Sequence, residues 1–299
     1  MTWVALGLVA GLVLGTDDCL TKLALREKDV LEVVLLSCVL DALVWAPFLL
    51  APPAASHALQ PWGLYPASLG WRDQAMVLPK SLMMVATWVL SYYAVKALPL
   101  SISAGVRASG PLWTAAGAIV LLGEQLTWWQ WLGLAVSMLS YTLFSRIGSK
   151  EGIRFHRDGW VLCMLVATLL SSAIALYDKH ILAGLRLDLA AVQAWSAVQR
   201  GVIALALLPW VGRSLTLRGL FTRHWAIPAI ALAYVAAEYL YLTAVQTEGA
   251  LISVISVLRR TNLVMVFGLS ALFFQERFIR EKTLAMGGVL AGIVLTLAA

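Results

Sequence analysis

Long apolar segments recur along the whole chain of 299 residues, and they constrain its fold more than any other feature. A helix needs about 20 mostly apolar residues to cross the hydrocarbon core of a bilayer. Ten segments meet this requirement: 3–25, 30–50, 75–97, 100–122, 128–146, 159–183, 189–211, 225–247, 250–274 and 283–299. The long connection 51–73, rich in proline and aromatic residues, is expected at the membrane surface. The sequence therefore predicts an all-α membrane protein with ten transmembrane helices.

The composition also points to lipid as the solvent. The chain is 61% hydrophobic and 13% charged, whereas ordinary globular chains are about 25% charged. A water-soluble fold is excluded, because a soluble exterior needs far more charge. The net charge of +6 suits the basic loops of a multi-pass protein in a cell inner membrane. No basic run is interleaved with aromatic residues, so we expect no nucleic-acid partner.

The expected partners are therefore the lipid bilayer and a small-molecule substrate, and a homodimer stays open as an alternative to a monomer. We expect no metal and no other cofactor. The three cysteines are widely separated within apolar segments and form no CxxC pair: Cys19, Cys38 and Cys163.

The two halves of the chain resemble each other. The turn Leu122-Gly123-Glu124-Gln125-Leu126 has a counterpart in Phe274-Gln275-Glu276-Arg277-Phe278. Superposing the two glutamates also superposes further polar residues, and the starts of the halves match at constant spacing: Arg107 on Arg259, Ser101 on Ser253, and Trp3 and Lys22 on Trp160 and Lys179. Five spans is an odd number, so the second half must enter the membrane from the opposite side. The pattern predicts a 5+5 inverted repeat with a site at the repeat interface, divided as 1–146, a basic linker 147–158, and 159–299.

Each unit has a Gly/Gln-Glu-x-apolar turn before its last span, and in this the chain resembles the EamA branch of the drug/metabolite transporter superfamily. Pro111 and the Asp178-Lys179 pair add to the resemblance, which covers residues 3–299. It implies two EamA-like repeats, 1–146 and 159–299, and a secondary transporter, often an exporter of amino acids or related metabolites. Two positions depart from the family pattern: Asp41 stands where arginine is usual, and Gln275 replaces glycine.

We single out eight of the charged residues that fall within the predicted spans: Asp17, Asp18, Asp41, Arg107, Arg200, Glu238, Arg259 and Arg260. A charge at the bilayer centre costs about 2.5–3.5 kcal/mol on insertion scales. At about 1.5 Å rise per residue, three depth-matched groups are expected: Asp17 and Asp18 with Arg107, Asp41 with Arg200, and Glu238 with Arg259 and Arg260. Buried pairs are poor stabilisers, so we favour a hydrated cavity over permanent ion pairs. Snorkelling is a separate alternative for Arg107, Lys22, Lys96 and Lys179.

The fourth predicted span contains a break. Pro111 has no N–H, and its ring displaces the carbonyl of Arg107. Together with Gly110 it predicts a hinge, since irregular backbone at this depth must line a cavity or be buried in protein. A kink that only improves packing is the alternative.

We assign roles on this basis. Substrate binding is assigned to Arg107, Arg259, Arg200, Asp41, Trp88, Tyr92 and Asn262. Proton or cation coupling is assigned to Asp17, Asp18 and Glu238, and the hinge to Gly110 and Pro111.

The predicted orientation depends on which feature is weighed. The loops after the odd-numbered spans carry most Lys and Arg residues, whereas the termini and other loops carry little beyond Arg72 and Arg186. Since such an excess marks the cytoplasmic side, the charges predict both termini outside. The family resemblance implies both termini inside.

The function we expect is secondary transport, not enzymatic catalysis: export of a small polar or amphoteric metabolite, such as an amino acid or a derivative, by proton-coupled alternating access. One alternative is an exchanger or flippase for phosphorylated metabolites or lipid head groups, favoured by the arginines. A remote alternative is an intramembrane enzyme of prenyltransferase type, because Asp17-Asp18 and Lys22 are faintly similar to its metal-binding motif. A non-transporting sensor should lack a cavity.

Overall fold

The computed structural model describes residues 2–150, 157–211, 225–273 and 279–297. Every regular element in these ranges is a helix. The longer ones are α1 (Thr2–Glu27), α2 (Val30–Leu49), α4 (Trp71–Ala97), α7 (Trp128–Lys150), α8 (Gly159–Lys179), α9 (Leu189–Leu205), α11 (Ala226–Gln246) and α14 (Ile279–Leu297). The predicted all-α membrane fold is confirmed for this part of the chain, where six helices are long and apolar enough to cross a membrane.

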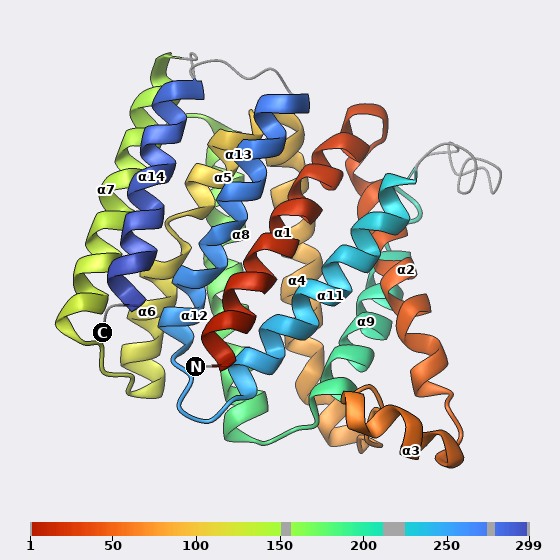
Figure 1. The fold of residues 1–299 in the computed structure, drawn as a ribbon. Helices are drawn as coiled ribbons and strands as arrows, with labels where there is room; N and C mark the ends of the chain where they lie inside the picture. The colour runs from red at the N-terminus through yellow and green to blue at the C-terminus, as the bar shows by residue number, and fades with distance from the viewer. Residues whose placement is uncertain (1, 151–156, 212–224, 274–278, 298–299) are drawn as a thin grey trace.

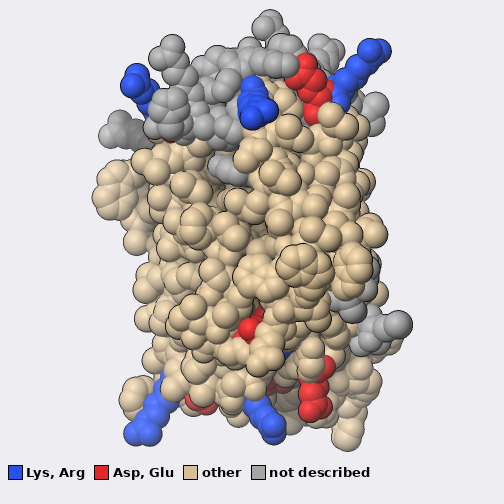
Figure 2. Space-filling view, turned by 90° about the vertical axis from the view of Figure 1, so that its left-hand side faces the viewer, with Lys and Arg blue, Asp and Glu red and all other residues tan. Residues whose placement is uncertain are grey.

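Figure 1 shows these helices as one bundle, with both ends of the chain toward the same end of the molecule. On the face drawn in Figure 2, charged side chains gather at the two ends, and a wide belt that is almost free of charge lies between them. Such a belt is what a lipid environment selects. The ten-span count remains a prediction.

The connection after α2 forms short helices, η1 (Pro53–Ala55), α3 (Ser56–Leu59) and η2 (Gln60–Trp62), at one end of the bundle (Figure 1). Tyr239 Oη donates to the Trp62 carbonyl at 2.7 Å, and the Ala67 N–H donates to Asp188 Oδ2 at 3.1 Å. These bonds tie the segment to the second half of the chain.

Two helices are broken at arginines. The fourth predicted span divides into α5 (Leu100–Arg107) and α6 (Gly110–Leu122), and Pro111 lies in the first turn of α6, where its missing N–H costs nothing. The ninth divides into α12 (Ile252–Leu258), η4 (Arg259–Thr261) and α13 (Asn262–Phe273). The break expected at Gly110 and Pro111 is therefore observed, and a second break lies at the matching place in the other half.

Contacts between the halves follow a paired pattern. Helix α1 packs on α11 as α8 packs on α4, while α2 packs on α9 and α7 on α14 (Figure 1). Exchanging the two halves reproduces this set of contacts. Glycines permit the closest approaches, because a Cβ at Gly15 would lie 2.5 Å from the Asn262 carbonyl oxygen, and one at Gly292 would lie 2.6 Å from that of Gly133.

Two lysines near the end of the first helix of each half also correspond: Lys22 in α1 and Lys179 in α8. Lys22 Nζ donates to the Val95 carbonyl and, at 2.7 Å, to that of Leu98. Lys179 Nζ donates to the carbonyls of Val245 at 3.3 Å and Ala250 at 2.7 Å. Each ammonium therefore binds the free carbonyls at a helix C-terminus, where positive charge is favoured, and neither needs to reach the membrane surface.

Candidate functional site

A cavity lies where the two halves meet, with walls from α1, α4, α5, α6, α8, α11, α12 and η4. Most of the residues assigned to the site from the sequence are in its wall: Asp17, Asp18, Trp88, Tyr92, Arg107, Gly110, Glu238 and Arg259. Four others lie behind the wall or beside it: Asp41, Pro111, Arg200 and Asn262. The inverted-repeat argument had placed a site at this interface, and the structure has a polar cavity there.

The guanidinium and the backbone carbonyl of Arg107 both make polar contacts within the protein. Its Nη1 pairs with Asp18 Oδ1 at 2.7 Å, and Asn262 Nδ2 donates to Asp18 Oδ2 at 3.0 Å. The Arg107 carbonyl, which the break was expected to free, accepts from Arg260 Nη1 at 2.7 Å. The expected pairing of Arg107 with Asp18 is observed, and the Arg260 guanidinium satisfies the Arg107 carbonyl.

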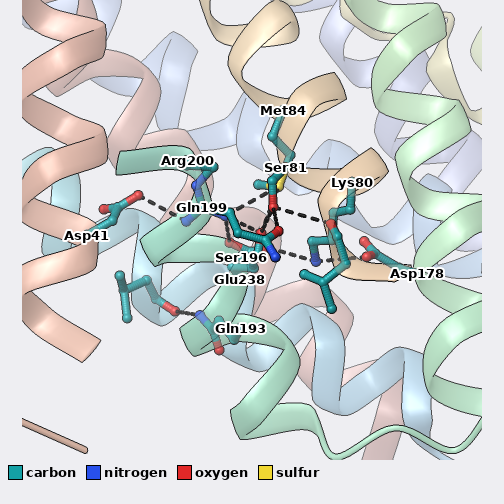
Figure 3. A network of polar contacts seen from close by, with 12 residues as sticks. Asp41, Lys80, Ser81, Met84, Asp178, Gln193, Ser196, Gln199, Arg200 and Glu238 are labelled. Atoms are coloured by element: carbon teal, nitrogen blue, oxygen red, sulfur yellow. Dashed lines mark hydrogen bonds and ion pairs between the residues drawn. The ribbon is translucent and has the colours of Figure 1, made fainter. Parts of the chain in front are cut away.

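Arg200 and Asp41 form the second expected pair, at 3.2 Å between Nη2 and Oδ2, and both are fully buried. Arg200 Nη1 also donates to Ser196 Oγ at 2.9 Å and lies 3.6 Å from Glu238 Oε2 (Figure 3). The guanidinium lies 5.4 Å from the ring centroid of Trp88, an aromatic residue of the wall. Arg200 therefore supports the wall from behind, and a direct role in substrate binding stays a prediction.

Lys80 is the residue that sequence reasoning missed. It is fully buried, and its Nζ lies 2.7 Å from Asp178 Oδ1 and 3.0 Å from Glu238 Oε1 (Figure 3). Its position inside the predicted span 75–97 was the available signal. The cations that pair with Glu238 are therefore Lys80 and Arg200, so the expected grouping of Glu238 with Arg259 and Arg260 was wrong.

This buried network has an unequal number of charges. Asp41, Asp178 and Glu238 contribute three carboxylates, and Lys80 and Arg200 contribute two cations. With all groups ionised, the network carries one net negative charge. Because Asp178 and Glu238 reach the cavity wall, a proton or a cation in the cavity can neutralise it.

Three charged groups in the wall have no ionic partner in the described part of the chain: Asp17, Arg259 and Arg260. Arg260 donates to the carbonyls of Ser256 and Arg107, which leaves Arg259 and Asp17. The Arg259 guanidinium lies 4.2 Å from the centroid of the Tyr241 ring, and its Nε has no hydrogen-bond acceptor there. Asp17 is 6% exposed, and its Oδ1 likewise lacks a donor among the described residues. An unpaired buried charge is costly unless a ligand or a proton completes it, so the cavity offers one cation and one carboxylate for binding.

The family assignment follows from the first half of the chain. Residues 1–146 match the model of the EamA-like transporter family. They form an EamA-type unit of the drug/metabolite transporter superfamily. The resemblance noted from the sequence is confirmed over residues 1–146, and the EamA unit makes this chain a membrane transporter.

Comparisons of the whole chain support the fold. No curated protein is significantly similar to it in sequence. Among solved structures, 28 chains match significantly. One, described only as the crystal structure of a protein, aligns over 98% of this chain and 95% of its own, with a TM-score of 0.66 and 14% identity. At that identity the likeness shows the fold alone.

Proposed function

We propose that this EamA-type transporter exports a small amphoteric metabolite, such as an amino acid or a derivative, by alternating access in a cell inner membrane. In this proposal ten helices form a 5+5 inverted repeat of residues 1–146 and 159–299. The paired contacts of α1 with α11 and α8 with α4 support it, as do the matching breaks at Arg107 and Arg259. Rocking of the two halves about the shared cavity would expose it to either side in turn.

The observation that carries the proposal is the combination of unpaired Arg259 and unpaired Asp17 in the wall of one cavity. A guanidinium favours a carboxylate, which it can bind through two parallel hydrogen bonds. A carboxylate favours an ammonium group. A ligand with a carboxylate and an ammonium group would give both residues a partner of opposite charge. We therefore assign Arg259 to the anionic end of the substrate and Asp17 to the cationic end. Trp88 and Tyr92 would contact its apolar part.

The buried network supports coupling to a proton or another cation. Its one net negative charge is adjacent to the cavity through Asp178 and Glu238. Asp18 is held by Arg107 and Asn262, so we assign it to holding the two halves together, and assign coupling to the network and to Asp17.

A phosphorylated substrate is the second candidate, because three guanidinium groups reach the same cavity: Arg107, Arg259 and Arg260. Four carboxyl side chains in the same wall disfavour it: Asp17, Asp18, Asp178 and Glu238. The prenyltransferase alternative has lost support, since Asp18 and Lys22 are both engaged within the protein.

The test is a ligand screen by thermal stabilisation of purified protein, followed by counterflow of the best ligand in proteoliposomes. Amino acids, their decarboxylated and esterified analogues, and sugar phosphates form the panel. We expect Arg259→Ala to abolish stabilisation by acids with a free carboxylate and Arg259→Lys to retain part of it. The exposed Arg72→Ala is the control. Unchanged transport in Arg259→Ala would refute the site assignment, and a preference for phosphates would favour the second candidate.

A further inference from the structure

The short connection between α11 and α12 is held by charged side chains at both of its ends. It turns through Gly249, whose φ is +74° and suits glycine. Lys179 binds the carbonyl of Val245, in the last turn of α11, and that of Ala250, in the connection itself. On the other side, the Glu124 carboxylate receives the first N–H groups of α12. The positive Lys179 therefore lies at the C-terminal end of α11 and the negative Glu124 at the N-terminal end of α12, as the two helix dipoles favour.

Glu124 makes three hydrogen bonds with the start of α12. It accepts from the Ile252 N–H at 2.7 Å, the Ser253 N–H at 3.2 Å and the Ser253 hydroxyl at 2.5 Å. These N–H groups have no partner within their own helix. Glu124 lies just after α6, behind Gly123, and so belongs to the first half, whereas α12 belongs to the second. The carboxylate therefore joins the two halves.

The contact extends into the cavity wall along α6 and α12. The Ser256 hydroxyl donates to Thr114 Oγ1 at 3.3 Å, and Ile252, Ser256 and Thr114 all line the cavity. We call this contact between α6 and α12 the seam. Helix α12 has seven residues and spans about 10 Å, and Arg259 follows its last residue. Glu124 thus binds the N-terminal end of α12, a short helix whose C-terminal end is followed directly by Arg259.

We propose that Glu124 is the latch of the seam and the positioning residue for Arg259. With the latch closed, α12 stays against α6 and would close the cavity at its own end of the bundle, the end toward which both chain termini lie in Figure 1. When the three bonds break, α12 separates from α6, the cavity opens at that end, and Arg259 moves with it. The proposal rests on the proposed alternating access, and the comparison of variants that tests the latch itself does not require a known substrate.

The experiment measures access to the cavity from each side of the membrane. A single cysteine, Ser171→Cys, is placed in the cavity wall after the native Cys19, Cys38 and Cys163 are replaced by alanine. A second reporter, Glu248→Cys, lies in the exposed connection between α11 and α12 and shows which side that end faces. Labelling by a membrane-impermeant maleimide is then timed in intact cells and in inside-out vesicles.

Neutralising the latch should change labelling at Ser171→Cys in opposite directions on the two sides. Glu124→Gln loses charge-assisted hydrogen bonds, so we expect labelling from the side of the α11–α12 connection to rise about tenfold and labelling from the other side to fall. Glu124→Asp keeps the charge and should restore part of the wild-type rate. Ser253→Ala removes one of the three bonds and should give a smaller change in the same direction. Gln125→Ala, the exposed neighbour in the same turn, is the matched control.

The outcomes separate the latch from the proposed function. Equal labelling rates for Glu124→Gln and Gln125→Ala would overturn the latch and leave alternating access standing. A reporter that labels from only one side in every variant, with no shift on adding a transported ligand, would overturn both. If Glu124→Gln fails to give folded protein by size-exclusion chromatography, Ser253→Ala and Glu124→Asp decide the question, and wild-type labelling in both refutes the latch.

Discussion

Replacing Lys80 by methionine tests the buried network most directly. At an effective dielectric constant of about 20, contacts of 2.7 and 3.0 Å to Asp178 and Glu238 are each worth about 6 kcal/mol of Coulomb attraction. Desolvation of the fully buried ions offsets much of that gain. In Lys80→Met, Glu238 retains Arg200 at 3.6 Å, but Asp178 has no cation among the described ion pairs. The expected loss is that of one uncompensated buried charge, about 3–5 kcal/mol.

The assay is equilibrium unfolding in mixed micelles, read by tryptophan fluorescence. Adding Asp178→Asn to Lys80→Met removes the stranded charge, so the double variant should recover about 2 kcal/mol or more of the free energy of unfolding. Lys96→Met is the matched control on the same helix, because Lys96 is 40% exposed and lies 3.7 Å from an exposed Asp29, and it should cost less than about 1 kcal/mol. Equal losses in Lys80→Met and Lys96→Met would refute the reasoning.

Two further perturbations probe the helix contacts. The Thr114 and Ser256 hydroxyls lie 3.3 Å apart. Oxidation of a Thr114→Cys/Ser256→Cys pair should therefore fix the seam and stop transport, and a reductant should restore transport. Transport that continues after complete oxidation would show that the seam does not open. Gly292→Leu should lower the free energy of unfolding by about 1–3 kcal/mol, because a Cβ there would lie 2.6 Å from the Gly133 carbonyl oxygen. Gly287→Leu, with open space around it, should leave the free energy of unfolding unchanged. Unfolding measurements that do not separate the two variants would contradict close packing of α7 on α14.

Much of the fold could be predicted because its causes are local in the sequence. Apolar length identifies the spans, and Pro111 identifies the break between α5 and α6. Depth alone also matched Arg107 with Asp18 and Arg200 with Asp41, because helical rise converts residue number into height. Both pairs are observed.

The rest depended on how each helix is rotated, which residue number does not give for a helix surrounded by apolar contacts. Glu238 therefore appeared to match Arg259 in depth, although it faces Lys80 and Arg200. Lys80 was overlooked because a lysine close to a span end resembles one that reaches the surface. The second glutamate turn, with Glu276, lies outside the described residues, so only Glu124 can be placed.

Arg259 lacks an acidic partner because the two halves of the chain differ in sequence. The spacing that matches Lys22 to Lys179 matches Asp18 to Ala175, so the second half lacks the acid that pairs with arginine in the first. Ala175 lines the same cavity as Arg259. Ala175→Asp should therefore supply the missing partner, pair with Arg259, and abolish carboxylate binding and transport while the protein stays folded. Ala175→Asn, of nearly the same size but uncharged, should retain more transport. If both variants transport equally, the free charge of Arg259 is not what the substrate requires.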